Sequence, residues 1–309
     1  MSKESGNYFK ELEINKVGYF KREFTISAED GLDLSITEFE VEDPKAVIQM
    51  IHGAKEHKER YYDFICFLNK NGYAVVISDN RGHGKSVNSR FSLGHMEGIA
   101  DILTDQYQIT KYIKHKYAGK PLYLFGHSFG SCLARNYLQK HDEEIEKLIL
   151  SGTANYIPAS GFGQLLGKVI MLFNGKKGHH KILMKLGESE DDSWVVKNPK
   201  IKAEYQKDPL CTGYKYTNNA VVTIWESDYE LKRYAHYMCK NSDLKILSVT
   251  GDEDPISGGE TGLTDTVNTL HKIGYQDVRT IVYPGMKHEV LNEEGKQQVY
   301  EDILVFLEE

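Results

Sequence analysis

Apolar and polar residues alternate along two stretches near the start of the chain, residues 20–26 and 32–39, with the turn residues Glu29-Asp30-Gly31 between them. Because the side chains of a strand point alternately to its two faces, this pattern predicts an antiparallel hairpin. Residues 46–51 are more continuously apolar, which is typical of a strand that is buried on both faces.

Strands and helices then alternate along most of the chain. The predicted strands cover residues 74–78, 122–125, 147–151, 245–250 and 278–283. The predicted helices cover residues 60–71, 98–117, 131–140, 262–273 and 294–306. This order predicts an α/β fold with a mostly parallel central sheet and helices on both faces.

The alternation stops between about residues 155 and 240, where several helical patterns occur and no strand is indicated. We therefore expect one sheet domain, residues 1–153 and 243–309, interrupted by a helical cap, residues 154–242. One predicted cap helix is apolar over most of its circumference, with large residues at helical spacing: Phe162, Leu165, Leu166, Val169, Ile170 and Phe173. Such a helix either lines an acyl-chain tunnel or touches lipid, or it packs beneath the cap.

Composition excludes several classes of protein. The net charge of −7 argues against a nucleic-acid partner. Four scattered cysteines without a C-x-x-C pair indicate neither a zinc site nor a disulfide framework. The polar start, residues 1–16, lacks a signal-peptide pattern, and no stretch approaches the roughly 20 apolar residues of a spanning helix. We therefore expect a cytoplasmic protein, and its oligomeric state stays open.

A serine flanked by glycines, Gly126-His127-Ser128-Phe129-Gly130, lies between the predicted strand 122–125 and the predicted helix 131–140. In this strand–turn–helix context G-x-S-x-G is typical of a nucleophilic serine, because only small residues fit beside so tight a turn. The alternative is a glycine-flanked serine in an ordinary strand–helix turn. We take Ser128 as the candidate nucleophile.

A serine hydroxyl needs a general base that is held by a third group. In this kind of fold the acid and the histidine follow the serine, each on a loop after a later strand. Three acids follow the strand 245–250, and we assign the orienting role to Asp254, with Asp252 as its main rival and Glu253 as a solvated residue. His288, in the loop after the last strand, is the candidate base.

The oxyanion that forms during acyl transfer needs N–H donors that are already in place. One candidate donor is the backbone N–H of Phe129, directly after the nucleophile. The other is that of Ala54, in the loop after the strand 46–51. This chemistry requires neither a metal nor an organic cofactor, and we expect none.

Several segments together resemble the monoglyceride lipase and bacterial lysophospholipase-like branch of the α/β-hydrolases, of the serine aminopeptidase S33 type. They are His52-Gly53-Ala54-Lys55-Glu56-His57 with Arg60-Tyr61, Asp79-Asn80-Arg81-Gly82-His83-Gly84-Lys85-Ser86, the Ser128 turn, Gly251 to Pro255, and His288-Glu289-Val290-Leu291-Asn292-Glu293. The resemblance covers about residue 30 to the end and implies an α/β-hydrolase fold. It also implies catalytic roles for Ser128, Asp254 and His288, with Ala54 and Phe129 as oxyanion donors.

The resemblance further implies that Glu56 and Arg60 line the polar end of the substrate pocket. The alternative is a buried Glu–Arg pair that only shapes its loop. Four other histidines at family positions are expected to bond to loop backbone: His52, His57, His83 and His127. Leu291 stands where the mammalian lipases carry a second histidine, so details of their alcohol site do not transfer.

We therefore expect a serine hydrolase that cleaves lipid esters, monoacylglycerol or lysophospholipid, and that touches a membrane surface transiently through the cap. A serine aminopeptidase, a short-chain carboxylesterase and a non-catalytic ligand-binding relative are the alternatives. A peptidase would need acidic cap residues, such as the run 188–192, to bind a free amine. The basic stretch 176–181 with Lys185 could attract anionic lipid. The acidic run offsets its charge, so a solvated loop is the other interpretation.

Overall fold

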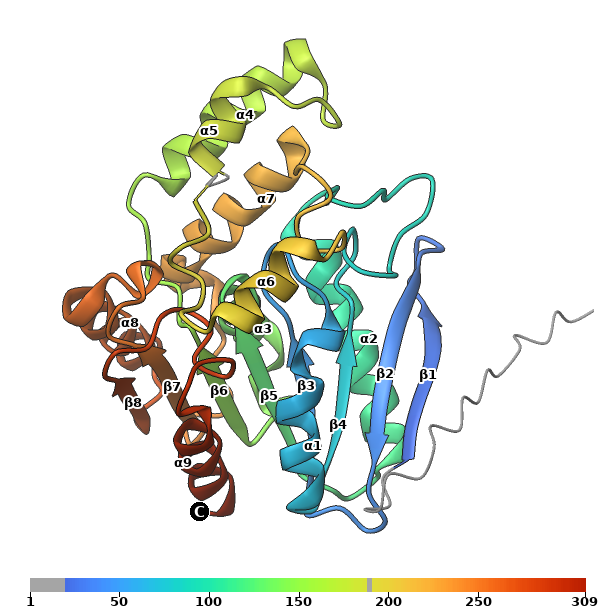
Figure 1. Cartoon of the computed structure of the whole chain (residues 1–309), viewed down its shortest axis with the longest axis vertical. Helices are drawn as coiled ribbons and strands as arrows, with labels where there is room; N and C mark the ends of the chain where they lie inside the picture. Colours follow the sequence, from blue (N-terminus) through green and yellow to red (C-terminus); the bar gives the residue numbers. More distant parts are fainter. Residues whose placement is uncertain (1–19, 188–190) are drawn as a thin grey trace, which may run out of the picture.

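The computed structural model describes residues 20–187 and 191–309. The predicted strands form one sheet in the order β1-β2-β4-β3-β5-β6-β7-β8 (Figure 1). The strands are β1 (Phe20–Ser27), β2 (Asp33–Glu40), β3 (Ala46–Ile51), β4 (Tyr73–Ser78), β5 (Leu122–His127), β6 (Lys147–Ser151), β7 (Lys245–Gly251) and β8 (Val278–Tyr283). β2 pairs antiparallel with β1 and with β4, and all other neighbours are parallel. The predicted hairpin and the mostly parallel sheet are confirmed.

Helices connect most of the parallel strands. The α-helices are α1 (Tyr62–Lys70), α2 (Ile99–Lys116), α3 (Phe129–His141), α4 (Ser160–Asn174), α5 (Lys181–Gly187), α6 (Pro199–Lys207), α7 (Asn218–Tyr229), α8 (Gly259–Ile273) and α9 (Lys296–Glu308). The 3-10 turns are η1 (Lys58–Tyr61), η2 (Asp142–Glu144), η3 (Glu230–Lys232), η4 (Tyr234–His236) and η5 (Pro255–Ser257).

The core consists of two apolar layers, one on each face of the sheet. β3 shows how the strands divide between them: Val47 and Ile51 join the layer that includes buried residues of α2 and α3. Ile48 and Met50, which point the other way, join the layer that includes α1 and α9. A continuously apolar strand is therefore needed here, because both of its faces are covered.

The five predicted helix starts differ from the structure by one to three residues, and the largest difference is at α8, which begins at Gly259 rather than at residue 262. The predicted helix 60–71 begins as the 3-10 turn η1 and becomes α-helical only at Tyr62. The last helix begins at Lys296 because the preceding Gly295 adopts a left-handed conformation with φ 85°. The polar start of the chain and residues 188–190 of the acidic run lie outside the described residues.

Between β6 and β7 the described residues form α4 to α7 and no strand. Figure 1 places these helices beyond the carboxyl ends of the parallel strands. In the part of the chain that the structure describes, no helix is both long enough and apolar enough to cross a membrane.

Two glycines let α3 approach the ends of β3 and β5. A Cβ on Gly130 would lie 2.2 Å from the carbonyl oxygen of Ile51, and a Cβ on Gly126 would lie 2.3 Å from that of Gly130. Neither contact is possible for a residue with a side chain. The glycines thus fix Ser128 between β5 and α3, beside the end of β3.

Gly130→Ala should lower the free energy of unfolding by about 3 kcal/mol, because the added methyl group collides with backbone that cannot move aside. Chemical denaturation followed by circular dichroism measures this. Gly119→Ala is the control: Gly119 has φ +82°, but no neighbouring atom lies within 4 Å of the place that its methyl group would take. Only the left-handed strain of about 1–2 kcal/mol is therefore expected there. Equal losses in the two variants would contradict the close approach.

Candidate active site

Ser128 occupies the turn between β5 and α3. Its φ of 55° and ψ of −120° are strained for a residue that carries a side chain. Its N–H donates to the carbonyl oxygen of Ser151 at the end of β6 (3.0 Å), which ties the turn to the neighbouring strand. Ser128 lines a cavity of about 570 Å³.

His288 and Asp254 lie in the loops after β8 and β7, at the same edge of the sheet as Ser128. His288 Nδ1 is 2.8 Å from Asp254 Oδ2, and both side chains are buried. The carboxylate also accepts hydrogen bonds from Thr250 Oγ1 (3.1 Å) and the Ile256 N–H (2.9 Å). Among the described residues, Nε2 of His288 has no hydrogen-bond partner, and His288 lines the same cavity as Ser128. This arrangement leaves Nε2 able to accept a proton from a group in the cavity.

The surroundings of His288 favour its charged form. Burial by itself would lower the pKa of His288, but the charge and hydrogen bond of Asp254 oppose it, and the charges of Glu289 and Glu56 add to this effect. The net result is a pKa above the ordinary value. An imidazolium that forms during proton transfer is therefore stabilised where it arises.

The two rival acids have other partners. Asp252 accepts a hydrogen bond from the Gly285 N–H (2.7 Å) and is exposed. Glu253 forms an exposed ion pair with Lys197 at 2.5 Å. Only Asp254 of the three is paired with His288, so the geometry favours the assignment made from the sequence.

The predicted oxyanion donors, Ala54 and Phe129, line the same cavity as Ser128. Phe129 is the first residue of α3, and N–H groups in the first turn of a helix have no intrahelical acceptor. The loop after β3 passes directly against Ser128, since a Cβ on Gly53 would lie 2.9 Å from Ser128 Cβ. Both N–H groups therefore belong to segments that meet at Ser128.

The cavity has apolar and acidic walls. Apart from Phe129 of α3, its large apolar residues come from the segment between β6 and β7 and from the loop after β7: Ile157, Leu186, Trp194, Val195, Ile224, Trp225 and Ile256. Its acidic residues are Glu56, Asp191, Asp192, Asp228 and Glu289. The space thus offers a large apolar surface together with carboxylates near the serine.

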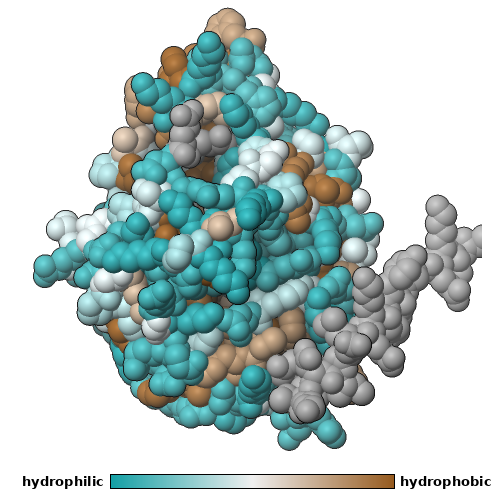
Figure 2. Space-filling model, in the orientation of Figure 1, coloured by the Kyte–Doolittle hydropathy of each residue, from teal (hydrophilic) through white to brown (hydrophobic). Residues whose placement is uncertain are grey.

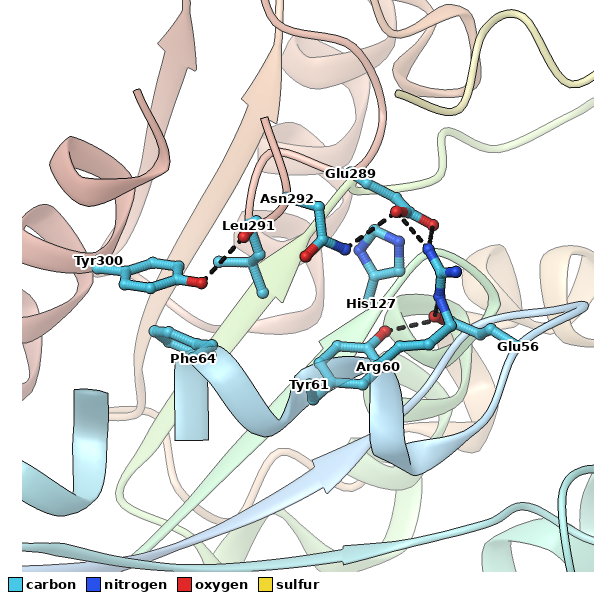
Figure 3. A pocket seen from close by; sticks show the side chains of 9 residues that line it. All are labelled: Glu56, Arg60, Tyr61, Phe64, His127, Glu289, Leu291, Asn292 and Tyr300. Carbon is cyan, nitrogen blue, oxygen red and sulfur yellow. Dashed lines mark hydrogen bonds and ion pairs between the residues drawn. The ribbon is translucent and has the colours of Figure 1, made fainter. Parts of the chain in front are cut away.

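Glu56 and Arg60 form a buried cluster with Glu289 (Figure 3). The sequence predicted no role for Glu289, although it belongs to the matched segment that begins at His288. Arg60 Nη2 lies 2.6 and 2.5 Å from the two carboxylate oxygens of Glu289, and Nε lies 3.5 Å from Glu56 Oε2. Glu56 and Glu289 line the large cavity, whereas Arg60 lines a smaller hollow of about 10 Å³ behind it. Arg60 and Glu289 are 229 positions apart, so no local pattern could have indicated their contact.

The other histidines of the matched segments are buried: His52, His57, His83 and His127. Burial lowers the pKa of His52 to about 3 and that of His83 to about 4, so both are neutral near pH 7. His52 bonds to loop backbone as expected, at the Gly53 carbonyl (2.8 Å) and the Asn80 N–H (2.9 Å). His57 differs from the expectation, because it pairs with a side chain from the segment between β6 and β7.

The partner of His57 is Asp208. Together with Cys211, these residues form the one group of possible metal ligands found in residues 20–187 and 191–309, and their ligand atoms lie within 4.8 Å of one another. His57 Nε2 is 2.8 Å from Asp208 Oδ2, and burial raises the pKa of the Cys211 thiol to about 12. The positive charge of Arg60 acts on both Asp208 and Cys211 and would repel a cation. The group fits a hydrogen-bonded contact better than a metal centre.

Comparisons with known proteins match one family over most of the chain. The family described as "Serine aminopeptidase, S33" matches residues 42–295. The chain is 26% identical over 269 residues to the monoacylglycerol lipase of Mycolicibacterium smegmatis, which covers 84% of this chain and 87% of that protein.

Two solved structures resemble the fold. A thermostable carboxyl esterase from Bacillus coagulans superposes with a TM-score of 0.81 at 24% identity, covering 93% of this chain and 98% of the esterase. A monoglyceride lipase from Saccharomyces cerevisiae superposes with a TM-score of 0.72 at 19% identity, covering 94% of each chain. The predicted α/β-hydrolase fold is confirmed.

The rate at which a fluorophosphonate labels Ser128 should fall as the pH is lowered through a pKa above about 6.5, the ordinary histidine value. His288 accepts the serine proton only when neutral, and its raised pKa keeps it protonated to a higher pH. In Asp254→Asn the acid limb should move to lower pH, and labelling should slow by about 10⁴-fold, the loss typical of such a change.

Asp252→Asn is the matched control, because it makes the same chemical change two residues away at an acid that holds only the Gly285 N–H. It should label at the wild-type rate with the wild-type acid limb. The reverse result, with Asp252→Asn impaired and Asp254→Asn active, would move the orienting role to Asp252.

Proposed function

The chain belongs to the serine aminopeptidase S33 family of α/β-hydrolases, and on that premise we propose that it hydrolyses carboxylic esters of lipids, monoacylglycerol or lysophospholipid. The observation that carries this proposal is the cavity of about 570 Å³ beside Ser128. Small-molecule sites have volumes of about 300–1,000 Å³ and mostly apolar walls. A single fatty acyl chain with a small alcohol fits such a space.

The proposed cap, residues 154–242, supplies most of the apolar wall. Ile157, Ile224 and Trp225 belong to it, and they line the cavity together with Ser128. A long acyl chain gains about 0.8 kcal/mol for each methylene group that leaves water. The names of the mycobacterial and yeast relatives, both lipases of monoacylglycerols, support the same substrate class.

Acylation begins when His288 Nε2 takes the proton of the Ser128 hydroxyl, whose oxygen attacks the ester carbonyl carbon. Asp254 holds the imidazole through Nδ1 and stabilises the imidazolium. The N–H groups of Ala54 and Phe129 donate to the oxyanion of the tetrahedral intermediate. The bond to the alcohol then breaks, and His288 returns its proton to the departing alcohol oxygen.

Deacylation repeats these steps with water in place of the serine. His288 removes a proton from a water molecule, whose oxygen attacks the acyl-enzyme carbonyl. The bond to Ser128 breaks, the serine oxygen regains its proton from His288, and the fatty acid leaves. Every proton and electron pair is accounted for by these residues and the substrate.

An aminopeptidase is the second candidate, because carboxylates do line the cavity. Asp191 and Asp192 come from the acidic run that a peptidase would use to bind a free amine. Asp192 already forms an ion pair with Lys202 at 3.3 Å, and Glu289 is paired with Arg60. These partners reduce the negative charge left for an amine, so the ester proposal comes first.

We expect fatty-acid release from monoacylglycerol or from lysophosphatidylcholine of the same chain length, and its loss by about 10⁶-fold in Ser128→Ala. The two lipids differ only in the alcohol, so their ratio of kcat/KM identifies the preferred head group. Titration of released fatty acid measures both.

An amino-acid p-nitroanilide, assayed beside the lipids, tests the second candidate. Turnover of the anilide alone, abolished in Ser128→Ala, would replace the lipid proposal with a peptidase. A wild-type protein that is folded but is not labelled by a fluorophosphonate would leave only a ligand-binding role.

The outer face of α4 fits the expected contact with a membrane surface. The face that packs against α7 carries small or polar residues, with Gly163 against Trp225 and Gly167 against Val222. Five large apolar residues of α4 are exposed, namely Phe162, Leu165, Val169, Leu172 and Phe173, whereas Leu166 and Ile170 are partly buried. Brown and tan surface appears at the top of the molecule in Figure 2, where α4 and α5 lie in Figure 1. Large exposed apolar patches mark interaction surfaces.

The charges near this surface favour contact with anionic lipid. Residues 160–187 contain no acid and several lysines, namely Lys168, Lys176, Lys177, Lys181 and Lys185, although the whole chain has a net charge of −7. Each lysine near an anionic leaflet contributes about 1 kcal/mol to binding. An anionic lipid surface therefore complements α4 and α5 better than a neutral one.

The double variant Leu172→Ser/Phe173→Ser should bind vesicles that contain anionic phosphatidylglycerol at least about tenfold more weakly than wild type, because burial of each side chain contributes about 1.5–3 kcal/mol. Vesicle flotation measures this. Wild-type binding should also weaken with added salt.

Val305→Ser is the control, since Val305 is also exposed but lies on α9, at the opposite end of the molecule (Figure 1). It should leave vesicle binding unchanged. Equal binding by wild type and the α4 double variant would contradict a membrane contact through this helix.

A further inference from the structure

The buried cluster of Glu56, Arg60 and Glu289 joins two loops that meet at the site (Figure 3). Glu56 belongs to the loop after β3, which carries Ala54. Glu289 directly follows His288 in the loop after β8. Arg60 in η1 contacts both carboxylates, so one guanidinium links the loop of the proposed oxyanion donor to the loop of the proposed base.

Each carboxylate is fixed at its own end. Glu56 Oε1 accepts hydrogen bonds from the Gly53 N–H and from the Tyr61 hydroxyl (2.7 Å). Glu289 Oε2 accepts a hydrogen bond from Asn292 Nδ2 (3.0 Å). These contacts leave little freedom for either side chain, so a displacement of one loop is transmitted to the other through Arg60.

Arg60 is held in the middle of the cluster. Its guanidinium lies 4.9 Å from the centre of the Tyr205 ring, which belongs to α6. The side chains of Arg60, Glu56 and Glu289 are 11%, 6% and 6% exposed. In such a dry environment an ion pair resists screening by salt, and removal of one partner is costly.

We propose that Glu289 is a positioning residue, which holds the His288 ring in register with the oxyanion donors through its contact with Arg60. This inference rests on the proposed function, because it takes Ser128 and His288 as nucleophile and base. It assigns no contact between Glu289 and the reacting atoms.

A purely structural role is already filled by a neighbour. Glu293 accepts hydrogen bonds from the N–H groups of Lys197 (2.8 Å) and Lys287 (3.1 Å), and so fixes the same loop from its other side. Glu293 does not share Arg60 with the cluster. We therefore assign anchoring of the loop to Glu293 and alignment of His288 to Glu289.

Electrostatics supply a readout that anchoring alone would not change. The titratable groups that act on His288 are Asp254, Glu289, Glu56 and His127. Those that act with Glu289 are Arg60, Glu56, Tyr61, Tyr205 and Cys211. Burial and the charge of Glu289 together raise the pKa of Glu56 to about 7, against the opposing effect of Arg60.

Glu289→Gln removes one negative charge beside His288, so the pKa of the histidine should fall. We expect the acid limb of kcat/KM for p-nitrophenyl acetate to move to lower pH. Because a displacement of 1 Å can cost about a hundredfold, we expect kcat to fall by roughly tenfold, with little change in KM. The rate of fluorophosphonate labelling of Ser128 should fall in parallel.

Glu293→Gln is the matched control from the same loop. It should lower the midpoint of thermal unfolding while the acid limb stays at the wild-type pH. A folded Glu289→Gln variant with the wild-type kcat and acid limb would overturn the proposal. So would an acid limb that moves equally in Glu289→Gln and Glu293→Gln.

Glu289→Asp covers the case in which Glu289→Gln does not fold. It keeps the charge but shortens the reach to Arg60, so we expect the wild-type acid limb with a reduced kcat. A wild-type kcat in this variant would contradict the positioning role. If lipids are not hydrolysed but wild-type Ser128 is labelled, the lipid proposal fails and the Glu289 test still stands; if Ser128 is not labelled, the proposed function fails first.

Discussion

The close approach of α3 to the end of β3 is the constraint on which the site depends. Without side chains at Gly126 and Gly130, the helix starts directly against the Ile51 carbonyl. Ser128, in the turn between these two glycines, has a positive φ of 55° and lies beside the loop that carries Ala54. The backbone strain of the turn is offset by the surrounding packing, and the segments that carry Ser128, Phe129 and Ala54 meet at one cavity.

Buried charge is the second organising feature. Three carboxylates, those of Asp254, Glu289 and Glu56, raise the pKa of His288, while one buried guanidinium, that of Arg60, faces two of them. The resting site therefore contains more negative than positive charge. In the proposed reaction, proton transfer to His288 would bring the balance closer to neutrality, so the charge distribution suits the state that this step would create.

Patterns of neighbouring residues in the sequence predicted those parts of the site that are formed by a single continuous segment. The strand–turn–helix around Ser128, and the loops that carry Asp254 and His288, follow from periodicity and strand order. The role of Glu289 could not be derived in this way, because its partner Arg60 is 229 positions away. Glu289 lies far from Glu56 and Arg60 in the sequence, so its pairing with Arg60 cannot be predicted without the three-dimensional fold.

The apolar helix 160–174 shows a different limit. Its sequence is apolar around most of its circumference, so periodicity could not tell which face is covered. In the structure, Gly163 and Gly167 pack against α7 and Ile170 is partly buried, whereas Phe162, Leu165, Val169, Leu172 and Phe173 are exposed.

Two residues connect this outer surface with the cavity. Leu186 and Ile157 are 61% and 53% exposed, yet both also line the space beside Ser128. These two residues therefore contribute apolar surface both to the outside of the proposed cap and to the cavity. Under the proposed function, an acyl chain that contacts Leu186 or Ile157 at the surface would remain in contact with the same side chain as it enters the cavity, so less of its apolar surface would return to water on the way.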